Sequence, residues 1–295
     1  MSALEKPLRQ QSCQYEYPSP VKIDFNSSAY FMIPSSIILN KNMGDKRITA
    51  FSFFSTKRGL GCDLDFSLNR LVEWTGRKPD RHSNGINNKF ADVIKCLIDN
   101  DYIEVSGEIK NTSYTEAFFK LENVVQECKH DRFAVVYLDE LKKILNYRNP
   151  NPKDSFLNND VLLLLFVYLR MMIFRRRNKL LPEEINLENK CDHEYDIRVR
   201  RMRSPDTYND YYCEIAEKLG MSQRTVSKAT EILKELKLIY SEQLPRTKHD
   251  EKWTTNHTIF CNYYKREGGY LLASGEEYYM SEINRKKKKL SIVNK

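Results

Sequence analysis

The sequence has few of the residues that hold metals and disulfide frameworks. Its seven cysteines are an odd number, are widely scattered and include no Cys-x-x-Cys pair, and its five histidines show no spacing typical of a metal site or a catalytic triad. Cys191 and His193 form a single Cys-x-His pair with no second pair at a ligand spacing, so we interpret them as loop residues. We therefore expect neither a disulfide framework nor a metal site.

Motifs of common enzyme classes are missing as well. The sequence contains no Gly-x-x-x-x-Gly-Lys-Ser/Thr loop, no Gly-x-Gly-x-x-Gly turn, no His-Glu-x-x-His helix and no Gly-x-Ser-x-Gly elbow. Gly59-Leu60-Gly61 is a turn with two glycines that lacks the rest of a phosphate-binding fingerprint. We expect a protein that is not an enzyme and that uses no cofactor.

Signals for export or membrane insertion are also absent. The N-terminal residues show no basic region followed by an apolar one, which argues against secretion. The most apolar run, 161–174, contains Arg170, is followed by three arginines and is too short to span a bilayer. We interpret this run as a buried helix and expect a cytoplasmic protein with no membrane partner.

The composition favours a globular, basic protein with two domains. Its 41% of hydrophobic residues suffice for packed cores, and 295 residues exceed the usual size of a single core. The net charge is +8, from 48 Lys and Arg against 40 Asp and Glu. Because the surplus gathers at 175–177, 198–203 and 285–289, it suits either phosphate contacts or a solvated surface.

Residues 207–246 carry the clearest local pattern in the chain. An apolar stripe predicts a helix over 211–219, Gly220 permits a left-handed turn, and Ser222 is placed to cap a second helix over 222–236. A strand that opens at 239 and a returning strand at 258–261 follow. The pattern therefore predicts two helices joined by a tight turn, followed by a β-hairpin.

Polar side chains gather on the outward face of the second helix, within its first two turns. Arginine can bind the major-groove edge of guanine, glutamine that of adenine, and serine and threonine either bases or phosphates. The candidate residues are Ser222, Gln223, Arg224, Thr225, Ser227 and Lys228, to which the hairpin loop adds Arg246, Lys248 and Lys252. These positions are typical of a recognition helix that enters the major groove.

The first half of the chain repeats this outline. A helix is expected over 47–57, and a second helix, capped by Ser67 and stopped by a glycine, follows it. Residues 90–98 carry an amphipathic helical pattern, and strands are expected over 102–105 and 117–121. The two halves therefore share an order of elements rather than residue identities.

A polar stretch lies between the second and third expected helices of the first half. It holds further candidates for nucleic-acid contact, namely Arg77, Lys78, Arg81, Asn84, Asn87 and Lys89. Pro79 and Gly85 make its backbone hard to predict. The stretch fits a polar turn on a structural or dimerising domain equally well.

The second half resembles the winged helix-turn-helix superfamily. The resemblance rests on the order Ile-Ala-x-x-Leu-Gly-x-Ser-x-x-Thr-Val over 215–226, and it implies binding to double-stranded DNA. The tandem layout resembles the winged-helix replication initiators of bacterial plasmids and phages. That resemblance implies binding to repeated origin sites and recruitment of host replication proteins, with no enzymatic activity.

The expected architecture is α+β and mainly helical, with two winged-helix domains in tandem. Residues 133–145 read as a strand that runs into a helix, within the segment expected to connect the domains. The expected segments are a flexible arm (1–28), a first domain (29–125), a connector (126–153), a second domain (154–266) and a basic tail (267–295). A homodimeric transcriptional regulator and a non-catalytic adaptor for other proteins remain alternatives, because the same fold serves both.

Overall fold

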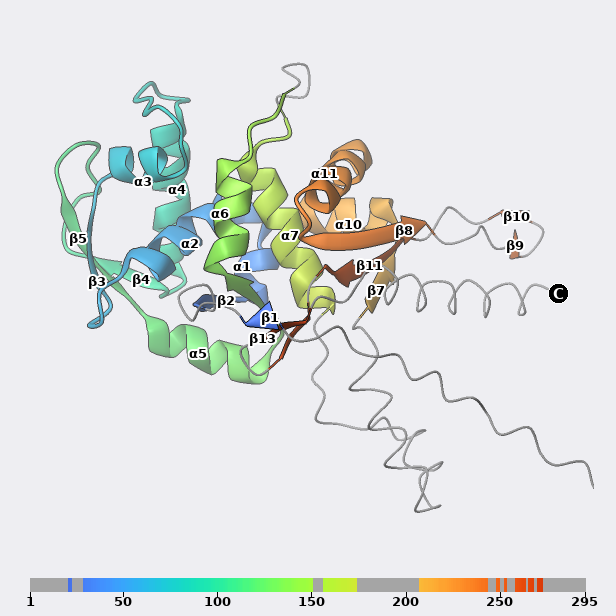
Figure 1. Ribbon diagram of the computed structural model, residues 1–295. Helices are drawn as coiled ribbons and strands as arrows, with labels where there is room; N and C mark the ends of the chain where they lie inside the picture. The colour runs from blue at the N-terminus through green and yellow to red at the C-terminus, as the bar shows by residue number, and fades with distance from the viewer. Residues whose placement is uncertain are drawn as a thin grey trace, which may run out of the picture.

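The computed structural model describes residues 21–22, 29–150, 156–173, 207–243, 248–249, 252–253, 258–263, 265–267 and 270–272. These residues form helices and small sheets in which every described strand pair is antiparallel (Figure 1). The fold is therefore α+β, as the sequence predicts. Within the part of the chain that is described, no helix is both long enough and apolar enough to cross a bilayer.

The first half contains a three-stranded sheet packed against three helices. Its elements are α2 (Arg47–Lys57), β3 (Asp63–Phe66), α3 (Leu68–Trp74), α4 (Ile86–Asp99), β4 (Ile103–Val105) and β5 (Thr115–Phe119). The strands lie in the order β3-β5-β4. The predicted helix over 47–57 is confirmed, and the amphipathic helix begins at Ile86, earlier than its apolar stripe shows. Strand β3 escaped prediction because four residues are too few to establish a period.

The second half repeats this order of elements. It contains α7 (Asn159–Ile173), β7 (Thr207–Asp210), α10 (Tyr212–Leu219), α11 (Gln223–Glu235), β8 (Ile239–Gln243) and β11 (Thr258–Asn262). The strands lie in the order β7-β11-β8, which is the arrangement of the first sheet. Two short strands, β9 (Lys248–His249) and β10 (Lys252–Trp253), pair between β8 and β11. Both predicted helices and the hairpin are thus confirmed.

A further set of elements builds onto the first half. It consists of β2 (Tyr30–Pro34), α1 (Ser35–Leu39), the 3-10 turn η2 (Lys41–Met43), α5 (Leu121–His130), β6 (Phe133–Tyr137) and α6 (Leu138–Asn146). Strand β6 pairs with β2 from the far end of the same half, and α5 lies against β2. Most of the segment 126–153 thus belongs to packed elements, and the strand that runs into a helix within it is confirmed.

Parts of the expected arm and tail pair with each other. Strands β1 (Val21–Lys22), β12 (Lys265–Glu267) and β13 (Tyr270–Leu272) form one sheet in the order β1-β13-β12. Val21 is paired with Leu271 and Lys22 with Tyr270. The arm and the tail expected as separate extensions thus meet at these residues, which local composition does not reveal.

Helix α7 is the element that the two halves share. Its side chains are buried almost all round, and it packs against β6, α2 and α6 on one side and against α11, β7 and β11 on the other. Figure 1 shows it between the first-half helices and the α10–α11 pair. A helix that is apolar on every face has to be covered on every face. The two halves are therefore joined by one continuous hydrophobic core.

Candidate nucleic-acid interface

The turn between α10 and α11 has the local geometry that its residues predict. Gly220 adopts φ 70°, a left-handed conformation that a side chain disfavours. The Ser222 hydroxyl then accepts a hydrogen bond from the Thr225 backbone N–H at 3.0 Å and caps α11. Val226 and Leu233 on the inner face of α11 are fully buried. The turn and the buried face together fix which side of α11 is presented to solvent.

The outward side carries the polar residues that the sequence predicts for it. Ser222, Gln223 and Arg224 are exposed, whereas Thr225, Ser227 and Lys228 are half-buried. The six side chains thus lie within the first two turns of α11, next to free backbone N–H groups that favour an anion. This arrangement places hydrogen-bond donors and positive charge together at the start of α11.

Phe156 lies against this outward side, which sequence reasoning missed. The Arg224 guanidinium carbon is 6.0 Å from the centre of its ring, and the Lys228 ammonium nitrogen is 5.7 Å from it. Both distances are those of cation–π contacts. No local pattern could have found this residue, because it comes from the chain just before α7.

A network of polar contacts anchors α10 on β7 and α7. The Lys218 ammonium group is 2.8 Å from an oxygen of Asp210, which also accepts a hydrogen bond from the Tyr208 hydroxyl. Tyr208 in turn lies 3.0 Å from the Tyr168 hydroxyl. Burial acts to raise the pKa of Asp210, but the hydrogen bonds from Lys218 and Tyr208 outweigh it and lower that pKa. The helix pair is thus held rigidly on its sheet.

In the first half, Asn87 is not on the surface. It is fully buried, and its amide donates to the side-chain oxygen atoms of Asn69 at 2.9 Å and Asn111 at 2.7 Å. Its own oxygen accepts from the Asp80 backbone N–H at 3.0 Å. The expectation that Asn87 contacts nucleic acid is therefore corrected, because its polar atoms already hold three segments together.

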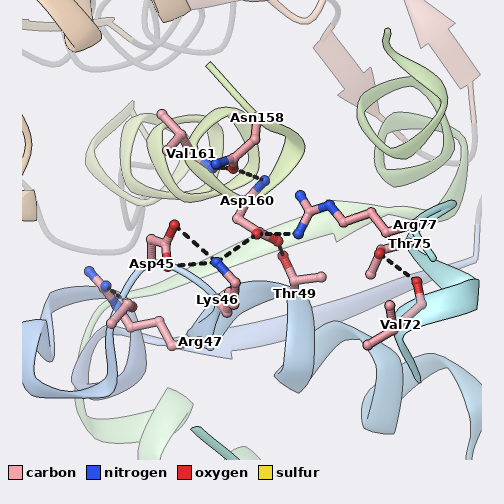
Figure 2. A network of polar contacts seen from close by, with 11 residues as sticks. Asp45, Lys46, Arg47, Thr49, Val72, Thr75, Arg77, Asn158, Asp160 and Val161 are labelled. Carbon is pink, nitrogen blue, oxygen red and sulfur yellow. Dashed lines mark hydrogen bonds and ion pairs between the residues drawn. The ribbon is translucent and has the colours of Figure 1, made fainter. Parts of the chain in front are cut away.

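Arg77 is likewise engaged inside the molecule. Figure 2 shows its guanidinium pointing at Asp160 in the first turn of α7, at a distance of 2.6 Å. Asp160 is fully buried. It also forms an ion pair with Lys46 at 3.3 Å and accepts a hydrogen bond from the Thr49 hydroxyl at 2.7 Å. Arg77 therefore binds one half of the molecule to the other and is not a free surface cation.

The other candidates of this stretch are at the surface. Lys78, Arg81, Asn84 and Lys89 are exposed around the start of α4. The backbone before α4 is tight, because a Cβ on Gly85 would lie 2.4 Å from the Asp80 carbonyl oxygen. These four residues remain available for contact with a ligand.

Several candidates lie outside the described part of the chain. Arg246 and the basic clusters at 175–177, 198–203 and 285–289 are among them. Lys248 belongs to β9 and Lys252 to β10, in the short hairpin between β8 and β11. Among the described residues, no group of three or more His, Cys, Asp or Glu side chains gathers as metal ligands would.

Comparison with protein-family models and with curated proteins identifies no relative of this chain. No protein-family model matches the sequence, and no curated protein matches it. Any assignment of function therefore depends on the interface itself.

Proposed function

We propose that this protein binds double-stranded DNA through two winged-helix units and performs no catalysis. The order of elements supports this proposal. In each half a helix, a strand and two further helices precede a hairpin, and the first strand joins that hairpin in a three-stranded sheet. This is the order of a winged helix, in which the third helix enters the major groove and the hairpin forms the wing.

One observation carries the proposal: the outward face of α11 at its first two turns. Gln223 and Arg224 are exposed there, and Lys228 follows one turn later, while the opposite face is buried in the core. Arginine offers two donors to a base edge, and glutamine offers a donor and an acceptor, so both can distinguish base pairs. The proposal is therefore sequence-specific binding, with α11 as the reading helix.

The tandem arrangement supports a more specific role. Elements of both halves pack on α7, which supports the proposal that one chain holds two groove-binding elements at one separation for a single duplex. We propose on this ground a replication initiator of a bacterial plasmid, a phage or another mobile element, with host replication proteins as partners. A transcriptional regulator would use the same reading helix, but as a symmetric homodimer on a palindromic site.

The test is selection of bound duplexes from a random pool at two salt concentrations, followed by sequencing. We expect enrichment of a defined motif, weaker binding at the higher salt, and loss of enrichment in Arg224→Ala. Lys142→Ala, which removes an exposed cation from α6, is the matched control and retains enrichment. Directly repeated motifs favour the initiator and palindromic motifs the regulator. Absence of binding at low salt would refute DNA binding altogether.

A further inference from the structure

We propose that Arg148, in the chain between α6 and α7, contacts a DNA phosphate midway between the two reading elements. This inference rests on the proposed DNA-binding function and extends it to a third contact region. It assigns a nucleic-acid contact to a residue that lies in neither helix-turn-helix.

Arg148 is held in place by its own helix end. Its guanidinium donates hydrogen bonds to the backbone carbonyl oxygens of Leu145 at 2.8 Å and Tyr147 at 3.0 Å. Both bonds come from one nitrogen, Nη1, so the rest of the guanidinium remains free for another acceptor. A side chain fixed in this way loses little rotamer freedom on binding.

The same guanidinium lies over the turn that precedes α4. A Cβ placed on Gly76 would lie 2.4 Å from Nη2 of Arg148, so a larger residue there would displace the guanidinium from this position. Gly76 also adopts φ 74°, like Gly220 at the matching turn of the second half. Arg148 therefore lies at the turn of the first helix-turn-helix, and Lys78, two residues after Gly76 in the chain, is exposed.

Phe156, which precedes α7, lies at the second helix-turn-helix. Phe156 contacts Arg224 and Lys228 on α11, as described above. In Figure 1 the two described flanks of the chain between α6 and α7, 147–150 and 156–158, rise between the α3–α4 pair and α11. Arg148 on one flank thus lies at the turn before α4, and Phe156 on the other flank lies at α11. We infer that a duplex bound to both reading elements would pass near Arg148.

Arg148 differs from Arg77 and Lys46 in how its positive charge is compensated. Arg77 and Lys46 are both paired with the buried Asp160, so their charges are largely compensated. Among the described residues, no acidic side chain forms an ion pair with Arg148, and it is exposed. An exposed, pre-positioned guanidinium without a carboxylate partner is suited to bind a phosphate oxygen.

The test compares the salt dependence of binding for the unsubstituted protein, Arg148→Ala, Arg148→Lys and Lys142→Ala on the enriched duplex. Loss of one phosphate contact lowers the slope of log affinity against log salt by about 0.9. We expect this decrease, and about a tenfold weaker affinity at low salt, for Arg148→Ala alone. Arg148→Lys keeps the charge and restores the slope. A purely structural role for Arg148 would leave the slope unchanged, and thermal unfolding checks that the variants remain folded.

The outcomes separate the two proposals. If the unsubstituted protein binds no duplex, DNA binding fails and the inference fails with it. If it binds but Arg148→Ala keeps the unsubstituted slope, or if Lys142→Ala lowers the slope equally, the phosphate contact at Arg148 is overturned while the reading helix stands.

Discussion

Asn84 and Asn87 show how two identical side chains in one short stretch take different roles. Asn87 is fully buried and connects the start of α4 to Asn69 and Asn111, whereas Asn84 is exposed in the turn before it. Removing a buried amide leaves the groups that it contacted without hydrogen bonds. This loss costs more free energy than an exposed hydrogen bond contributes.

Asn87→Ala should therefore destabilise the fold. We expect the free energy of unfolding to fall by about 2–3 kcal/mol, because the half-buried side chains of Asn69 and Asn111 lose the donor that the buried Asn87 supplies. Urea unfolding followed by circular dichroism measures this change. Asn84→Ala is the matched control and should stay within about 0.5 kcal/mol of the unsubstituted protein. Equal effects of the two substitutions would contradict the burial of Asn87.

Phe156 is expected to act through the two cations that it contacts. Phe156→Leu keeps an apolar side chain but removes the aromatic ring beside Arg224 and Lys228. A cation–π contact at an exposed site corresponds to about a two- to fivefold change in affinity, so we expect a loss of that size in DNA binding. Fluorescence anisotropy measures it. Phe156→Tyr retains a ring and should bind as the unsubstituted protein does; a loss as large as that of Phe156→Leu would contradict the ring contact.

At the scale of elements, Asp160 ties the beginning of α7 to the first half. Its carboxylate pairs with Arg77 from the chain before α4 and with Lys46 at the start of α2, and it is fully buried (Figure 2). Removing one partner of a buried ion pair leaves an uncompensated charge. The ion pairs therefore matter for how the two halves are held together.

Asp160→Asn should lower the free energy of unfolding by about 3–5 kcal/mol, because Arg77 loses its carboxylate partner while partly buried and Lys46 keeps only Asp45. Asp45→Asn is the control, since Asp45 is about half exposed beside the same lysine and its ion pair contributes at most about 1 kcal/mol. Chemical denaturation of the two variants gives both values. A small effect of Asp160→Asn would show that the network does not join the halves.

The contact of α10 with β7 predicts a dependence on pH. The pKa of Asp210 is lowered in the folded protein, so its contribution to stability is full above the ordinary carboxyl pKa and is lost as the pH falls through the lowered folded pKa. We expect Asp210→Asn to be less stable than the unsubstituted protein at neutral pH and to lose less stability on acidification. Thermal unfolding over an acidic pH series tests this, and parallel pH profiles would contradict it.

At the scale of the whole molecule, the shared helix α7 predicts that the halves unfold together. Its side chains pack against elements of both halves within one core, so neither half keeps a complete core without it. Leu233→Ala on the inner face of α11 should destabilise the protein by about 2–5 kcal/mol. Hydrogen exchange should show the same loss of protection in α4 as in α11. Unchanged protection in α4 would indicate two independent domains.

The features predicted from the sequence are those that depend on neighbours along the chain. The helical stripes over 47–57 and 222–236, the cap at Ser222 and the glycine turn at Gly220 are all local, and the structure confirms them. A helix needs only its own periodicity and end residues to be recognised. The outward position of Arg224 follows from the same periodicity, because the buried residues fix the opposite face.

What only the tertiary structure decided depends on contacts between distant segments. The short strands β3 and β7 form only because β5 and β11 pair with them, and β6 finds its partner β2 at the other end of the first half. The burial of Asn87 and the pairing of Arg77 with Asp160 have no local signature, since exposed and buried polar residues look alike in a sequence. The sequence alone determined the helices and the polar face of α11, because periodicity is local. Long-range packing decided which remaining polar groups face solvent, because burial depends on what lies across the core.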